Sequence, residues 1–163
     1  MQFEIVKVYP GRCTTFYSVK LDGENNTLFE KFVIENEQSC GAELEKISRS
    51  IRKMADVTGA REQFFKLKEG VPGDGVCALY DDPDKKLRLY CIRYGNVAMI
   101  LGSGGEKPKN IRALQESVEL TAENQLVRDI SRAITQALKS GQIWWSKNGI
   151  ELLCNEEPII IEF

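Results

Sequence analysis

The fold is decided by residues 76–109, VCALYDDPDKKLRLYCIRYGNVAMILGSGGEKPK. Three short apolar runs lie in this stretch, at 76–80, 87–94 and 97–101. Asp-Asp-Pro-Asp separates the first two runs and Gly-Asn separates the last two, and both separators are typical of turns. The runs are rich in β-branched and aromatic residues and too short for typical helices. We therefore predict a three-stranded antiparallel meander over residues 76–101.

The third run contains no polar residue, which indicates that both faces of this strand are covered. It leads into Gly102-Ser-Gly-Gly-Glu-Lys-Pro-Lys109, which we predict to be an exposed loop. The loop lacks the Gly-Lys-Ser/Thr ending of a P-loop. Its successive glycine amides can still bind a small anion, and Lys107 and Lys109 add positive charge. A flexible exit loop without a ligand is the alternative interpretation.

Three helices are predicted outside the meander, over residues 27–37, 42–58 and 121–139, because apolar residues recur there at helical spacing. Asn26 or Thr27 is the expected N-cap of the first helix. Residues 60–68 fit a short helix and a strand equally well, so the sequence leaves this segment open.

Strands are also predicted in the first and last parts of the chain, at 3–9, 13–21, 143–146, 149–153 and 158–163. The last of these is too apolar to be left exposed and is expected to join a sheet. The predicted fold class is α+β, with an antiparallel sheet packed by the three helices. Residues 1–140 are expected to form one domain, and residues 141–163 a β extension packed on it.

The amino-acid composition argues against several classes of function. The 163 residues carry a net charge of −2 and no histidine. The balanced charge argues against a strongly basic nucleic-acid binder, but not against a local basic patch. The lack of histidine removes the commonest general base and the commonest metal ligand. The five cysteines form no Cys-x-x-Cys pair, so neither a metal site nor a cofactor is predicted, and Cys77 and Cys91 are expected to be small buried thiols.

The sequence also bears on location. No apolar run approaches the roughly 20 residues that a membrane-spanning helix needs. The N-terminus lacks the charged and apolar regions of a signal peptide. We therefore predict a reduced, cytoplasmic protein without a membrane partner. The sequence indicates no particular oligomeric state.

The middle strand of the predicted meander contains two arginines. Because side chains alternate along a strand, Arg88 and Tyr90 share one face and Arg93 lies on the other. An arginine in a central strand needs a carboxylate or a cleft for its guanidinium. Arg88 beside Tyr90 can hold a phosphate next to a stacking surface. The alternative is an ion pair with Asp81 or Glu4 and no further role.

Residues 27–115 resemble the RelE/HigB superfamily of bacterial and phage toxins in three features. The first is the pair of predicted helices that precedes the meander. The second is Leu87-Arg-Leu-Tyr-Cys91, which is similar to the strand where that family often places an arginine ahead of an aromatic residue. The third is the apolar third strand of the meander, followed by the basic residues of Gly102–Lys109.

The resemblance implies a small α+β ribonuclease that acts on mRNA, often at the ribosome, without a metal or other cofactor, and that an antitoxin protein neutralises. In such a site an arginine or lysine stabilises the charge on the scissile phosphate, while another polar group takes the proton of the ribose 2′-OH. The resemblance assigns the catalytic roles to Arg88, Lys107 and Tyr90. It leaves the RNA-binding roles to Lys109, Arg93, Tyr94 and Arg112.

Two other functions are compatible with the same sequence. One is a non-catalytic interaction module of the same fold, which binds a protein partner through its helices or its C-terminal strands. The other is an anion- or nucleotide-binding regulator that uses the glycine-rich loop. RNA binding requires a coherent positive cleft around Arg88, Lys107 and Lys109. An interaction module requires an exposed apolar patch instead.

Overall fold

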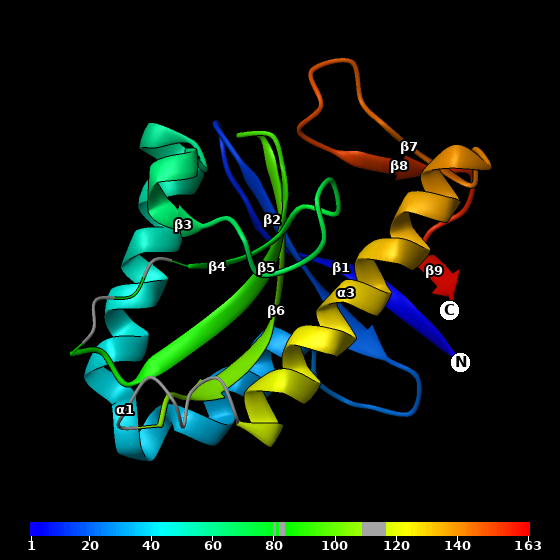
Figure 1. The fold of residues 1–163 in the computed structure, drawn as a ribbon. Coiled ribbons are helices and arrows are strands. Elements are labelled where there is room, and N and C mark those ends of the chain that lie inside the picture. Colours follow the sequence, from blue (N-terminus) through cyan, green and yellow to red (C-terminus); the bar gives the residue numbers. More distant parts are fainter. Residues whose placement is uncertain (80, 82–83, 109–116) are drawn as a thin grey trace.

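The computed structural model describes all residues of the chain except 80, 82–83 and 109–116. A seven-stranded sheet crosses the protein, with helix α1 on one face and helix α3 on the other (Figure 1). The strand order is β3-β4-β5-β6-β2-β1-β9. This arrangement confirms the predicted α+β class. The strands are β1 (Gln2–Pro10), β2 (Thr15–Leu21), β3 (Phe65–Lys66), β4 (Val76–Leu79), β5 (Leu87–Tyr94), β6 (Ala98–Glu106) and β9 (Ile159–Glu162).

Helix α1 (Leu28–Lys53) takes the place of the two helices predicted over 27–37 and 42–58. The expected interruption between them is a kink, with non-helical angles at Cys40 (φ −136°, ψ 33°). The helix then continues into a π-helical turn, Met54–Thr58. The Ser-Cys-Gly sequence therefore marks a bend in one helix and not the end of a first helix.

Both long helices begin at a side-chain cap. Thr27 Oγ1 accepts a hydrogen bond from the backbone N–H of Glu30, and the Glu30 carboxylate accepts one from the backbone N–H of Thr27, each at 3.1 Å. This pair is a capping box. Helix α3 (Val118–Lys139) starts before the predicted residue 121, because Ser117 is its cap and accepts from the N–H of Leu120 at 3.3 Å.

The sheet is mixed, which corrects the expectation of an antiparallel sheet. Strands β2 and β6 run parallel, with Thr15 opposite Ala98 and Ser18 opposite Leu101. The meander β4-β5-β6 is antiparallel, as expected. The parallel pair arises because α1 carries the chain across one face of the sheet between β2 and the meander, as a connection between parallel strands requires. Apolar patterns identify strands but do not show which distant strands meet.

Strand β6 is longer than the predicted 97–101, because it continues through the glycine-rich segment to Glu106. Residues 102–105 are therefore buried sheet, which corrects the exposed loop predicted from the sequence. The close approach of β5 explains the glycine at 104. A Cβ on Gly104 would overlap the carbonyl oxygen of Arg88. Glycine alone can occupy this position without moving one of the two strands.

Two hydrophobic clusters hold the helices against the sheet. Tyr90 and Ile92 of β5 lie in the cluster that includes α3, and Leu89 and Cys91 lie in the cluster that includes α1. Alternate residues of β5 thus serve opposite layers, as the strand geometry requires. Cys91 and its cross-strand neighbour Cys77 are buried thiols, as expected. Burial raises the pKa of Cys77 to about 12, which makes its thiol unreactive near neutral pH.

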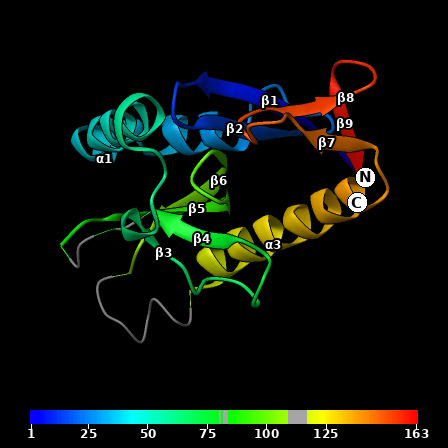
Figure 2. The same ribbon diagram turned by 90° about the horizontal axis from the view of Figure 1, so that it is seen from above.

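The C-terminal strand β9 pairs antiparallel with β1 and forms one edge of the sheet, as its apolar sequence predicts. The two termini lie side by side (Figure 1), and the N–H of Phe163 donates to the carbonyl oxygen of Met1 at 2.9 Å. Strands β7 (Ile143–Trp145) and β8 (Leu152–Cys154) form a separate hairpin near the end of α3 (Figure 2). The backbone of β8 donates one hydrogen bond to the hydroxyl of Tyr17 in β2, at 2.9 Å.

Candidate functional site

Three cationic side chains converge on the carboxylate of Asp81, which lies just beyond β4. Lys66 Nζ, on β3, lies 2.7 Å from Oδ1. Lys107 Nζ, just beyond β6, lies 2.5 Å from Oδ2, and Arg88 Nη2, on β5, lies 3.6 Å from Oδ1. Because β3, β4, β5 and β6 are neighbours in the sheet, the strand order brings these four side chains together.

A second carboxylate joins this group, which we call the Asp81 cluster (Lys66, Glu69, Asp81, Arg88 and Lys107). Glu69 Oε1 lies 3.9 Å from Arg88 Nη1. The side chains of Asp81, Lys107 and Arg88 are only 7 %, 9 % and 11 % exposed. At this depth a charge without a partner is strongly destabilising, so the cluster is a closed network in which each charge depends on the others.

Burial changes the acidity of two groups beside Arg88. It raises the pKa of Glu69 above its ordinary value, although the charges of Arg88 and Lys66 oppose the shift. It also raises the pKa of the Tyr90 hydroxyl, again against the charge of Arg88. The hydroxyl of Tyr90 therefore stays protonated near neutral pH. It can donate a hydrogen bond but cannot act as a base.

The structure brings two of the three predicted catalytic residues to a common partner. Arg88 and Lys107 share the Asp81 carboxylate, and Tyr90 follows Arg88 on the same face of β5. All three side chains are buried, whereas Lys107 was expected on an exposed loop. The ion pair between Arg88 and Asp81, which the sequence left as an alternative, is present. The other partner considered, Glu4, lies on β1, three strands away from β5.

Two predicted RNA-binding residues lie at the opposite end of β5 from Arg88. Arg93 Nε donates to the carbonyl oxygen of Ala60 at 3.0 Å, and its Nη2 donates to the side-chain oxygen of Asn96. Tyr94 packs on Trp145 with 5.1 Å between ring centroids, and burial raises the pKa of its hydroxyl. Both side chains are thus engaged in local packing and hydrogen bonds. They do not extend the Asp81 cluster.

The other two predicted RNA-binding residues, Lys109 and Arg112, lie outside the described residues. Sequence reasoning missed Lys66 and Glu69. They lie in or next to residues 60–68, which contain a short 3₁₀ helix followed by the two-residue strand β3. Such a short strand leaves no periodic signal, so nothing in the sequence placed Lys66 or Glu69 beside Arg88.

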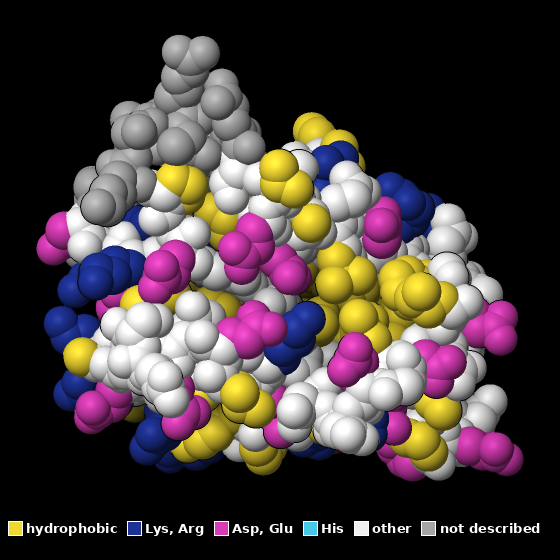
Figure 3. All heavy atoms as spheres, turned by 90° about the horizontal axis from the view of Figure 1, so that it is seen from below, with side chains coloured by type: hydrophobic (Ala, Val, Ile, Leu, Met, Phe, Trp, Pro, Cys, Tyr) yellow, Lys and Arg dark blue, Asp and Glu magenta, His cyan; other side chains and the backbone are white. Residues whose placement is uncertain are grey.

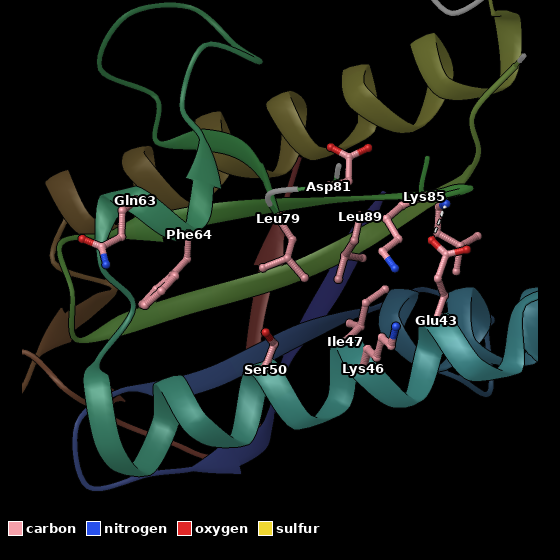
Figure 4. Close-up of a pocket in the computed structure, with 11 residues that line it drawn as sticks. Glu43, Lys46, Ile47, Ser50, Gln63, Phe64, Leu79, Asp81, Lys85 and Leu89 are labelled. Carbon is pink, nitrogen blue, oxygen red and sulfur yellow. Dashed lines mark hydrogen bonds between the residues drawn. The ribbon is translucent and has the colours of Figure 1, made fainter. Parts of the chain in front are cut away.

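A pocket of about 280 Å³ lies on the other side of this sheet edge, between α1 and the strands β4 and β5 (Figure 4). We call it the α1 pocket. Its apolar lining comes from both layers, with Ile47 on α1 facing side chains from the sheet side: Phe64, Leu79, Leu87 and Leu89. Asp81 stands at the boundary between the two sites, and Figure 4 shows its carboxylate pointing away from the pocket.

The molecular face that Figure 3 shows carries charges of both signs. Acidic and basic side chains are interspersed on that face, beside a group of hydrophobic side chains (Figure 3). Within the described residues, no three cysteine or acidic side chains gather closely enough to hold a metal ion. Neither long helix is apolar enough over a sufficient length, in the described part of the chain, to cross a membrane.

No protein-family model matches the chain, and no curated protein or solved structure is significantly similar to it. Its function is therefore inferred from the two sites described above. The Asp81 cluster gathers three cations around one carboxylate of the chain, and the α1 pocket is an apolar cavity with charged groups at its edge.

Proposed function

We propose that the chain is a RelE/HigB-like toxin-type protein that binds an RNA phosphate at the Asp81 cluster and cleaves the RNA without a metal. One observation carries this proposal: Arg88 of β5 and Lys107 beyond β6 converge on a single oxyanion, the Asp81 carboxylate. Guanidinium and ammonium groups recognise carboxylates and phosphates by the same charge-assisted hydrogen bonds. A site that holds one oxyanion with three cations has the charge to hold a phosphate.

An RNA phosphate would compete with Asp81 for these cations. Arg88 Nε is buried without a hydrogen-bond partner among the described residues. This donor supports an additional acceptor at the guanidinium. The side chain of Lys66 is the most exposed of the three cations, at 34 %, so the phosphate would approach from the β3 side.

Each side chain has a distinct role in the proposed reaction. Arg88 and Lys107 would stabilise the negative charge that develops on the scissile phosphate, which is the largest effect a fixed cationic site supplies. Tyr90, protonated at neutral pH, would donate a proton to the leaving 5′ oxygen. The Glu69 carboxylate beside Arg88 would take the proton of the ribose 2′-OH that attacks the phosphate. The partner that such a toxin implies is an antitoxin protein. The chain's RNA would be mRNA, alone or on the ribosome.

Regulated expression in bacteria tests this proposal, with growth and transcript integrity as readouts. The wild-type chain is expected to arrest growth and cleave transcripts, and Arg88→Ala is expected to abolish both effects. Arg132→Ala is the matched control, because the Arg132 side chain is 68 % exposed on α3 and its ion pair with Asp129 is a surface one. This control variant should behave as the wild type does.

A second variant separates loss of function from loss of fold. Arg88→Met combined with Asp81→Asn removes both partners of a buried ion pair, which proteins often tolerate better than the loss of one partner. Because Lys66 and Lys107 also lose the Asp81 carboxylate, we expect this double variant to melt at a lower temperature than the wild type, still in a cooperative transition, and to show no cleavage. A folded double variant that still cleaves RNA, or a wild type that leaves growth and transcripts unchanged, would show that the ribonuclease proposal is wrong.

One observation favours a second function, the non-catalytic interaction module. The Asp81 cluster is closed and buried, as an ion-pair network with a purely structural role would be. In that case the wild type would be inert toward RNA. Its partner would then be sought among the small proteins encoded next to it, and a stoichiometric complex in size-exclusion chromatography would support the module.

A further inference from the structure

We propose that the α1 pocket binds a small amphipathic monocarboxylate, with an apolar body about the size of one ring and a short chain that carries the acid. This inference does not depend on RNA cleavage, because Asp81 is the one residue that the pocket lining shares with the Asp81 cluster. The Asp81 carboxylate points away from it (Figure 4). The proposal rests on three properties of the pocket: its volume, its apolar lining and its balance of charge.

The volume and the lining set the size of the apolar body. The pocket measures about 280 Å³. An apolar protein cavity of about 150 Å³ is large enough to take up benzene, so this pocket has room for one aromatic ring and a short chain. Ile47 of α1 points toward Leu79 and Leu89 of the sheet across the opening (Figure 4). A ring between these three side chains would be shielded from water on both faces.

The charged groups at one end of the pocket favour an anion. Lys46 on α1 and Lys85 before β5 point toward each other across the pocket (Figure 4). Neither lysine forms an ion pair with any of the described residues. Two amines that face each other without a counterion repel, and a carboxylate between them removes the repulsion.

The acids of the pocket, Glu43 and Asp81, set the charge that a ligand would have to balance. Glu43 lies at the same end, and its Oε1 accepts hydrogen bonds from the backbone N–H groups of Lys86 and Leu87, at 2.9 and 3.1 Å. This carboxylate is held by the start of β5 and forms no ion pair with either lysine. Asp81, the other acid of the lining, is paired with the three cations of its own cluster. Among the described lining residues, the two lysines would therefore favour one carboxylate of a ligand.

The apolar lining excludes a strongly hydrated anion. A phosphate or sulfate placed here would lose water against leucine and isoleucine side chains while gaining only two amines, and burying a charge that is not fully paired is costly. Ser50 and Gln63 lie farther along the pocket from Lys85 (Figure 4). They supply hydrogen-bonding groups for a polar substituent at the far end of the ring.

A titration with a matched pair of probes tests the inference. The probes are 4-phenylbutanoate and its neutral analogue 4-phenylbutanamide, added to the ¹⁵N-labelled full chain and followed by backbone amide NMR signals. We expect the signals of Ile47, Leu79 and Leu89 to shift with both probes. The carboxylate should bind about fivefold to tenfold more tightly than the amide, as one well-placed charge interaction allows.

Two variants assign the effect to the pocket. Lys46→Gln with Lys85→Gln should remove the preference for the carboxylate, while Lys139→Gln with Lys147→Gln, which removes two exposed lysines elsewhere, should retain it. Ser50→Trp should fill the pocket from an exposed helix position and abolish binding of both probes. All variants are first checked for an unchanged thermal transition.

Three outcomes would overturn the proposal. The first is equal affinity for the acid and the amide in the wild type. The second is shifts confined to residues outside the pocket, and the third is unchanged binding in the folded Ser50→Trp variant. Each of these results is independent of whether the chain cleaves RNA, so a failure here leaves the proposal for the Asp81 cluster as it stands.

Discussion

The Asp81 cluster and the α1 pocket lie on two sides of one sheet edge. The cations of the cluster form ion pairs with the chain, and the lysines of the pocket form none with the described residues. In the cluster, three cations lie against carboxylates of the chain itself, and Asp81, Arg88 and Lys107 are almost fully buried. In the pocket, Lys46 and Lys85 form no ion pair with any described residue, and the Glu43 carboxylate is hydrogen-bonded to the backbone. The same residue types therefore pair with carboxylates of the chain in the cluster, whereas in the pocket, on our proposal, they would pair with the carboxylate of a ligand.

The largest expected effect on stability comes from removing the shared carboxylate of the Asp81 cluster. Asp81→Ala leaves three cations of the cluster without their shared carboxylate, and we expect the free energy of unfolding to fall by about 3–5 kcal/mol in urea denaturation. Asp129→Ala, at an exposed ion pair, is the control and should change it by less than about 0.5 kcal/mol. Added sulfate should stabilise Asp81→Ala more than the wild type, because it replaces the lost oxyanion. A loss below about 1 kcal/mol would contradict the closed network.

A second variant disturbs the cluster through the backbone alone. Gly104→Ala places a Cβ against the carbonyl oxygen of Arg88, so β5 and β6 must separate beside the cluster. We expect a loss of about 1–3 kcal/mol in unfolding free energy, as for other overpacked sites. Gly41→Ala is the control, and here we expect the free energy of unfolding to rise. Its Cβ meets nothing within 4 Å, and alanine should stabilise α1 by about 0.5–1 kcal/mol.

Substitutions in the α1 pocket should change the free energy of unfolding far less than substitutions in the Asp81 cluster. Lys46→Gln with Lys85→Gln removes two amines that have no ion pair among the described residues. We expect the free energy of unfolding to change by less than about 0.5 kcal/mol per substitution. Urea denaturation of the double variant beside Asp81→Ala measures the contrast directly. Equal losses in the two variants would erase the distinction between the two sites.

The smallest expected effect is a change in pH dependence at Glu69. Burial raises the pKa of Glu69 above its ordinary value of 4.5, so the folded chain binds more protons than the unfolded chain between these two pKa values. Stability should therefore fall as the pH rises through that interval. Glu69→Gln removes the titrating group and should flatten this part of the profile of melting temperature against pH. A profile identical to that of the wild type would show that Glu69 titrates normally.

Local signals in the sequence predicted much of the fold. The alternation along residues 87–94 predicted which side chains of β5 share a face, and Thr27 was one of the two residues predicted as the cap, because capping depends on a few neighbouring residues. The parallel pairing of β2 with β6 was missed, because it depends on where α1 delivers the chain. The glycine-rich end of β6 was also missed, since glycines usually indicate loops and here permit close packing with β5.

The candidate site was predicted only in part, because it also depends on contacts between segments that are distant in the sequence. Arg88 was recognised from its unusual place in an apolar strand, and Asp81 was named as one of two partners. Lys66 and Glu69 reach the cluster through the two-residue strand β3, which has no periodicity to detect. The grouping of Arg88 with Arg93 failed because alternation and distance along β5 place the two guanidinium groups in different surroundings.

The pairing of β9 with β1 has a consequence for how the chain acquires its structure. These strands join residues 2–5 to residues 159–162, almost the full length of the polypeptide apart. During synthesis β1 must therefore wait, with one edge unpaired, until residues 159–162 have left the ribosome. Contacts of such long sequence separation slow folding, and an uncovered strand edge invites pairing with other chains in the meantime.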